Sequence, residues 1–140
     1  MTTVVDTNII AALWDRDEAV NAAAQGALDA AQARGSLIVP APVYAELLAF
    51  GGRTESFLDS FLRETSITVN WDLEERVWRA AGLAFQSYAE RRRRQREPGR
   101  RRILADFLIG AFAFRKGYSL LTLDEGLYRA AFPSLPIVAI

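Results

Sequence analysis

Short apolar runs alternate along this chain with longer segments in which apolar residues recur every three or four positions. The runs are rich in Val, Ile, Leu and Thr, and they cover residues 2–5, 36–39, 66–71, 119–123 and 135–140. Runs of this length and composition are typical of buried strands. They lack a regular alternation with polar residues, which favours a parallel sheet covered by helices on both faces.

Helical periodicity fills the intervals between these runs. It predicts helices over residues 8–14, 18–34, 43–50, 55–64, 72–94, 103–117 and 124–132. Asp17 is a suitable N-cap for the second of these helices, and Gly35 is a suitable stop. Strands that alternate with helices indicate an α/β fold. The 140 residues have the usual size of one domain, so we expect residues 1–140 to form a single domain.

The residue types that are missing restrict the chemistry. The chain has no Cys and no His. Thiol nucleophiles, cysteine-based zinc sites, Ser-His-Asp triads and histidine metal ligands are therefore excluded. A hydrolase built from this sequence must work with carboxylates, and oxygen ligands suit Mg²⁺ or Mn²⁺ better than zinc.

The composition is that of an ordinary globular protein, with 51% hydrophobic and 24% charged residues. The first residues, MTTVVDTNII, contain an early acid and lack the positive start of a signal peptide. No apolar run approaches the roughly 18 residues of a membrane helix. We therefore expect a cytoplasmic protein without membrane association.

A formal net charge of zero hides a strong asymmetry. Residues 91–102 read RRRRQREPGRRR and hold eight of the 17 basic residues but one acid, so this segment carries +7 and the other residues carry −7. Such a segment can bind RNA phosphates, and the alternative is a solvated helix end followed by a loop. The candidate RNA-binding residues are Arg91, Arg92, Arg93, Arg94, Arg100, Arg101 and Arg102. Arg102 also lies one helical turn before Asp106, where it can contact substrate or hold that acid.

Four acids form the candidate catalytic and metal-binding group. Asp6 ends the first strand and Asp124 the fourth, whereas Glu46 and Asp106 lie on helices among mainly apolar neighbours. Ligands of open α/β sheets bind outside the carboxyl ends of the strands. Helix capping is the structural alternative for Asp6 and Asp124, and pairing with arginine is the alternative for the other two. A divalent cation offsets the repulsion among all four.

Polar residues flank two of these acids. Thr7 and Asn8 follow Asp6 directly, and Thr122 precedes Asp124 by two positions. Hydroxyl and amide groups so placed can orient a carboxylate that binds metal. The same groups are equally common in turns and caps.

Four motifs in this order and spacing resemble the PIN-domain family, and especially the VapC-type toxins of bacterial toxin–antitoxin pairs. The motifs are VVDTNIIAAL, PAPVYAELL, RRILADFLIGA and LLTLDEGLYRAAFPSLPIV, which together span Val4 to Val138. One departure is Phe112, where many relatives have a histidine that is not a metal ligand.

The resemblance implies a three-layer α/β/α fold with a parallel five-stranded sheet, and Mg²⁺- or Mn²⁺-dependent endoribonuclease activity. It assigns the metal ligands to Asp6, Glu46, Asp106 and Asp124, and supporting roles to Thr7, Asn8 and Thr122. It also implies a homodimer and a cognate antitoxin that occupies the active-site groove. The number of metal ions stays open.

Two other functions remain compatible with the sequence. One is a PIN-like module that binds RNA without cutting it, although retention of all four acids argues against it. The other is a metal-dependent phosphatase for a small phosphorylated substrate. A phosphatase predicts turnover of p-nitrophenyl phosphate and no need for the arginine segment.

Overall fold

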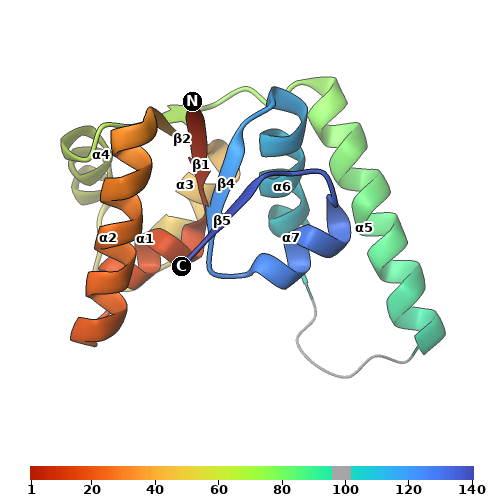
Figure 1. The fold of residues 1–140 in the computed structure, drawn as a ribbon, viewed down its shortest axis with the longest axis horizontal. Coiled ribbons are helices and arrows are strands. Elements are labelled where there is room, and N and C mark those ends of the chain that lie inside the picture. Colours follow the sequence, from red (N-terminus) through yellow and green to blue (C-terminus); the bar gives the residue numbers. More distant parts are fainter. Residues whose placement is uncertain (96–101) are drawn as a thin grey trace.

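Five parallel strands form one sheet in the computed structural model, which describes residues 1–95 and 102–140 (Figure 1). The strands are β1 (Thr2–Val5), β2 (Ser36–Pro40), β3 (Ile67–Asn70), β4 (Ser119–Thr122) and β5 (Ile137–Ala139). Their order across the sheet is β3-β2-β1-β4-β5. The predicted parallel five-stranded sheet is confirmed.

Helices connect the strands and cover both faces of the sheet. They are α1 (Thr7–Leu13), α2 (Glu18–Arg34), α3 (Ala41–Leu48), α4 (Glu55–Glu64), α5 (Glu75–Gln95), α6 (Leu104–Lys116) and α7 (Glu125–Ala131). In Figure 1, α2 lies on one side of the strands, and α6 and α5 lie on the other. Helix α6 packs against β4 and β2, and α5 packs along α6. The α/β/α layering is therefore confirmed.

The start of α5 shows the largest difference from the predicted boundaries. The pattern predicts a helix from Asp72, whereas the observed helix begins at Glu75. The Asn70 side chain accepts a 3.0 Å hydrogen bond from the Asp72 backbone amide. This turn competes with helix formation, so the helix begins three residues later than predicted.

Strand β1 lies in the middle of the sheet, and its residues are among the most buried. Val4 pairs with Ile38 of β2 and with Leu120 of β4. Helix α6 is buried from Phe107 to Ala113, which explains why its sequence is apolar on every side.

Gly110 lets α7 and the segment after it approach α6 closely. A Cβ atom at this position would lie 2.5 Å from the ring of Phe132 and 3.0 Å from the ring of Tyr128. The glycine is therefore required by packing, although it costs helix propensity.

The sheet order determines where the acids meet. Because β1 and β4 are neighbours and run parallel, their carboxyl ends lie at the same edge, and Asp6 follows one while Thr122 ends the other. The Asp6 backbone amide continues the ladder with a 3.0 Å hydrogen bond to the carbonyl oxygen of Leu121. Among residues 1–95 and 102–140, no helix is long and apolar enough to cross a membrane.

Candidate active site

Asp6 is a buried carboxylate at the junction of β1 and α1. Its side chain is held by two hydrogen bonds: Oδ1 accepts from the Thr7 backbone amide and Oδ2 from the Thr122 hydroxyl, each at 2.7 Å. The residue is only 4% exposed. The hydrogen bond from Thr7 caps helix α1. The hydrogen bond from Thr122 comes from another strand, β4, so helix capping does not account for it.

Burial sets the electrostatics of this residue. Loss of hydration raises the pKa of Asp6 from 3.8 to about 6. Hydrogen bonds from Thr122 and Thr7 and the nearby hydroxyl of Tyr128 oppose this rise in pKa, and the charge of Asp106 adds to it. A carboxylate in this setting gains from any cation that binds beside it, because the cation favours the charged form.

Glu46 joins Asp6 through a single shared residue. The Thr7 hydroxyl donates a 2.7 Å hydrogen bond to Glu46 Oε1, while the Thr7 backbone amide donates to Asp6. Helix α3, which carries Glu46, packs against α1 and β2. The first residue of α1 thus holds the acid that follows β1 and an acid of α3.

Thr122 and Asn8 connect α1 to the turn before α7. The Thr122 hydroxyl accepts from the Asp124 backbone amide at 2.9 Å and from the Asn8 side-chain amide at 3.5 Å. Asn8 Oδ1 in turn accepts from the Leu123 backbone amide at 3.1 Å. Thr7, Asn8 and Thr122 all contact the acids or the backbone that carries them, which is the arrangement that an orienting role requires.

Asp106 lies in the first turn of α6. Its Oδ2 accepts a 3.3 Å hydrogen bond from the Ile103 backbone amide, so the carboxylate caps the N-terminus of the helix. Helix α6 also packs against α3, which carries Glu46. The negative charge of Asp106 makes a small contribution to the raised pKa of Asp6.

Asp124 pairs with Arg102 rather than capping α7. Both guanidinium Nη atoms of Arg102 donate to the two carboxylate oxygens, Nη2 to Oδ1 at 3.4 Å and Nη1 to Oδ2 at closer range. The Asp124 side chain makes no capping hydrogen bond to α7. Asp124 occupies the N-cap position of α7, but its carboxylate binds Arg102 instead of the helix backbone.

All four acids line one pocket of about 540 Å³. A fifth acid, Asp15, lines it too, together with Arg102, Thr7 and Asn8, and Val20, Ala49 and Phe50 provide apolar walls. In the conformation described, no three acidic side chains of residues 1–95 and 102–140 approach closely enough to hold a metal ion. Carboxylate oxygens predominate among the polar groups that line the pocket, a donor set that fits Mg²⁺ or Mn²⁺.

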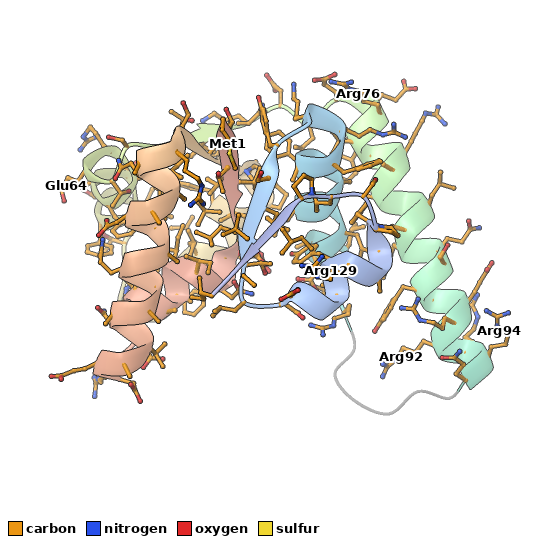
Figure 2. All side chains as sticks on the ribbon, in the orientation of Figure 1. Met1, Glu64, Arg76, Arg92, Arg94 and Arg129 are labelled. Carbon is orange, nitrogen blue, oxygen red and sulfur yellow. The ribbon has the colours of Figure 1, made fainter. Side chains whose placement is uncertain are left out.

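The arginine segment divides into two parts. Arg91, Arg92, Arg93 and Arg94 belong to the last turns of α5. Figure 1 shows that this end of α5 lies at the same side of the molecule as the carboxyl ends of β1 and β4, and Figure 2 labels Arg92 and Arg94 there. They do not line the acidic pocket, whereas Arg102 does. Arg100 and Arg101 lie outside the described residues.

Tyr128 is a residue that the sequence reasoning missed. It is 1% exposed, and its hydroxyl forms no hydrogen bond of ordinary geometry with the described residues, yet it lowers the pKa of Asp6. Burial and the charge of Asp6 in turn raise the pKa of Tyr128. Its spacing could have identified it: Tyr128 lies four positions after Asp124, so the two side chains lie on the same side of α7.

Phe112, a departure from the family pattern, lies in the core. It is fully buried, and its ring packs edge-on against Tyr118 with centroids 6.0 Å apart. It does not line the acidic pocket.

The fold and the pocket define a class of protein: a parallel α/β domain with acids converging at the carboxyl edge of the sheet. The family model of the PIN domain matches residues 3–133. The chain therefore belongs to the PIN domain family, which places it among the nucleases as a class. A search of curated protein sequences finds no significant match.

Solved structures with this fold include toxin–antitoxin complexes. VapBC2 from Rickettsia felis, bound to a DNA fragment from its promoter, matches with a TM-score of 0.68 and 19% identity, over 99% of this chain and 98% of that one. VapBC-1 from nontypeable Haemophilus influenzae matches with a TM-score of 0.65 and 20% identity, over 99% and 98%. FitAcB from Neisseria gonorrhoeae matches with a TM-score of 0.58 and 22% identity, over 96% and 95%.

Proposed function

We propose that this protein is a metal-dependent endoribonuclease and the toxin of a bacterial toxin–antitoxin pair. The observation that carries the proposal is the convergence of Asp6, Glu46, Asp106 and Asp124 from four separate parts of the chain on one pocket. Burying a carboxylate such as Asp6 is costly unless a partner compensates for it. A divalent cation supplies that compensation.

Asp6 and Asp106 are the principal metal ligands in this proposal, and Glu46 and Asp124 complete the site. These acids would hold Mg²⁺ or Mn²⁺, which would supply Lewis-acid polarisation of the scissile phosphate. The chain itself positions the ligands: Thr122 and Thr7 hold Asp6, and Thr7 also holds Glu46. Arg102 places a positive charge in the same pocket, where a phosphate oxygen can meet it.

RNA is the substrate that the charge distribution favours. The last turns of α5, which carry Arg91 to Arg94, lie at the same side of the molecule as the carboxyl ends of β1 and β4 (Figure 1), and Figure 2 labels Arg92 and Arg94 there. Arginine side chains bind phosphate oxygens with their forked donors, and they give affinity that depends on salt. We expect the protein to act in the cytoplasm, where its RNA substrates lie.

A cognate antitoxin is the protein partner in this proposal. The structures with the same fold include complexes named as toxin–antitoxin pairs. Phe50 forms part of the pocket wall and also packs edge-on against Trp14, with ring centroids 6.2 Å apart. Phe57 packs on the same Trp14 ring and is 44% exposed. An antitoxin segment bound over these aromatic side chains would cover the pocket and exclude RNA.

A second copy of the chain is the other expected partner. Trp71 and Trp78 are both largely exposed, and they share a shallow pocket with Pro42 and Leu73. Exposed tryptophans are enriched in protein interfaces. This surface is our proposed homodimer contact, and sedimentation of a Trp78→Glu variant tests it by the loss of dimer.

RNA cleavage mapped by sequencing tests the proposed function. Wild-type protein should cut RNA with Mg²⁺ or Mn²⁺ and stop cutting in EDTA. Asp106→Asn should keep its circular dichroism spectrum and lose cleavage by a factor of at least about 100, because a neutral amide is a poor metal ligand. Asp29→Asn, an exposed acid of α2, is the matched control and should cut normally.

The two alternative functions give different results in the same assay. A non-catalytic RNA-binding module would bind RNA without metal-dependent products. A phosphatase would turn over p-nitrophenyl phosphate, and its activity would not change when the α5 arginines are replaced. Normal cleavage by a folded Asp106→Asn protein would exclude this residue from the active site.

A further inference from the structure

The pocket extends beyond the acids around Asp6, along helix α1. Four pocket residues, Asn8, Ala11, Ala12 and Asp15, recur at helical spacing and so lie on one face of this helix. Asp15 continues the face beyond the helix end, because its backbone amide donates a 3.2 Å hydrogen bond to the carbonyl oxygen of Ala12. Two helical turns, about 11 Å, separate Asn8 from Asp15. One end of the pocket is therefore well removed from Asp6.

Helix α3 packs against α1 and is joined to it at both ends of the pocket. At the acidic end, the Thr7 hydroxyl donates to Glu46. At the other end, Phe50 packs edge-on against Trp14, with ring centroids 6.2 Å apart. Phe50 follows Glu46 by four positions, and Trp14 directly precedes Asp15. Phe50 and Asp15 therefore lie at the same end of the pocket, away from Asp6.

This distal end of the pocket is lined by Asp15, Val20, Ala49 and Phe50. Three of these side chains are apolar, and none of the described residues that line this end is basic. The negative charge of Asp15 repels a phosphate group, whereas the apolar walls favour a group without charge. The distal end therefore suits an uncharged ring better than it suits the RNA backbone.

The Phe50 ring is 40% exposed, yet the side chains beneath it fix its position. It rests on Trp14, and Trp14 is held in turn by Phe57 and Phe61, with ring centroids 5.8 and 5.4 Å away. The guanidinium carbon of Arg53 lies 4.5 Å from the centre of the Trp14 ring on this cluster. An aromatic side chain that is already ordered loses little conformational entropy when a planar group stacks on it. Phe50 therefore has the properties of a base-stacking residue.

We propose that the distal end of the pocket is a subsite for one nucleobase next to the cleaved phosphodiester bond, and that this base stacks on Phe50. The inference rests on the proposed ribonuclease function, because it requires an RNA whose phosphate lies among the acids. A base is linked through its sugar to that phosphate, so it must occupy space beside the acids. Asp15 can accept hydrogen bonds from the N–H groups of a base edge.

Cleavage of short RNAs that span a mapped cut tests the subsite. One RNA is intact, and two others carry an abasic ribose on one or the other side of the cut. With wild-type protein, one abasic RNA should have a KM at least about fivefold higher than the intact RNA, because one base–aromatic stack is lost. The kcat should change little, since stacking of this base stabilises the bound substrate and the transition state alike.

Substitution of Phe50 should reproduce the effect of removing the base. Phe50→Ala should raise the KM of the intact RNA by the same factor and should have no further effect on that abasic RNA. Phe50→Trp keeps a stacking surface and should retain the wild-type KM. Phe57→Ala is the matched control and should keep all wild-type values, because Phe57 is 44% exposed and packs on the same Trp14 ring but does not line the pocket.

Binding of the intact RNA provides a second measurement that does not depend on cleavage. Fluorescence anisotropy in an Asp106→Asn background should show at least about fivefold weaker binding when Phe50→Ala is added. Adding Phe57→Ala should leave the affinity unchanged. Circular dichroism and thermal melting confirm that the compared variants are folded.

The contrary results separate the subsite from the proposed function. A folded Phe50→Ala protein with the wild-type KM for intact RNA would overturn the inference, and Phe50 would then contact a protein partner alone. An equal rise in KM for the intact RNA and for both abasic RNAs would also overturn it, because the effect would not come from a base. Both results leave the nuclease proposal standing. A wild-type protein that cuts no RNA would overturn the proposed function instead.

Discussion

The Thr122 hydroxyl donates a 2.7 Å hydrogen bond to Asp6 Oδ2 and so joins residues that lie 116 positions apart in the sequence. Strands β1 and β4 are adjacent, which brings the two residues to one edge of the sheet. The same hydroxyl accepts from the backbone amide of Asp124. One side chain therefore orients a buried acid and fixes the turn that carries another.

Replacing Thr122 with valine should show how much that hydroxyl contributes to the stability of the fold. Valine preserves the shape but removes the donor to Asp6 Oδ2 and leaves only the Thr7 backbone amide on Oδ1, so the free energy of unfolding at pH 8 should fall by about 2–3 kcal/mol. Thr122→Ser retains the hydroxyl, so its free energy of unfolding should fall by clearly less. Urea unfolding measures both variants, and equal losses would assign the effect to packing rather than to the hydrogen bond.

The raised pKa of Asp6 makes the stability of the metal-free protein depend on pH. The folded pKa is about 6 and the ordinary value is 3.8, so the folded chain binds more protons between these values. The contribution of Asp6 to the free energy of unfolding is therefore greatest below pH 4. As the pH rises through 6, about 3 kcal/mol is lost.

Urea unfolding in EDTA between pH 4 and 8 checks this sign. Asp6→Asn should lack the decline and should be more stable than wild type above pH 6. Asp29→Asn, in which an exposed acid is changed, should follow the wild-type curve. The raised pKa is contradicted if the curves of Asp6→Asn and wild type run parallel.

Gly110 gives a prediction about packing. An alanine Cβ at this position would meet the Phe132 ring at 2.5 Å, so Gly110→Ala should cost about 1–3 kcal/mol of stability. A Cβ atom at Gly82 of α5 would meet no atom within 4 Å, so Gly82→Ala should gain up to about 1 kcal/mol from helix propensity. Opposite shifts in melting temperature are expected, and a stabilising Gly110→Ala would show that α7 can move away.

The basic end of α5 gives a prediction about RNA affinity. The slope of log affinity against log salt is negative, and changing Arg93 and Arg94 to glutamine should reduce its magnitude by about 1.4. Each phosphate contact to single-stranded RNA contributes about 0.7 to that magnitude. Arg76 and Arg79 lie at the other end of the same helix in ion pairs with glutamates, and changing both is the matched control. Fluorescence anisotropy at several salt concentrations measures the slopes. Equal slopes for the two double variants would remove the basic end from the RNA-binding surface.

The strand and helix order was predictable because both periodicities are local properties of the sequence. The apolar runs became strands, and the predicted N-cap Asp17 indeed accepts from the backbone amides of Ala19 and Val20. The family resemblance seen in four motifs is confirmed by the match to the PIN domain family over residues 3–133. The four acids were recognisable because charged residues at strand ends or on apolar helix faces are uncommon without a partner.

The sequence by itself therefore determined the elements, the family and the choice of candidate acids, since each depends on residues close together along the chain. Only the tertiary structure decided which groups meet. The sheet order placed Thr122 on Asp6, α5 anchored Arg102 toward Asp124, and close packing at Gly110 allowed Tyr128 to lie near Asp6. These contacts join residues from separate elements, and their partners depend on how helices and strands pack in three dimensions.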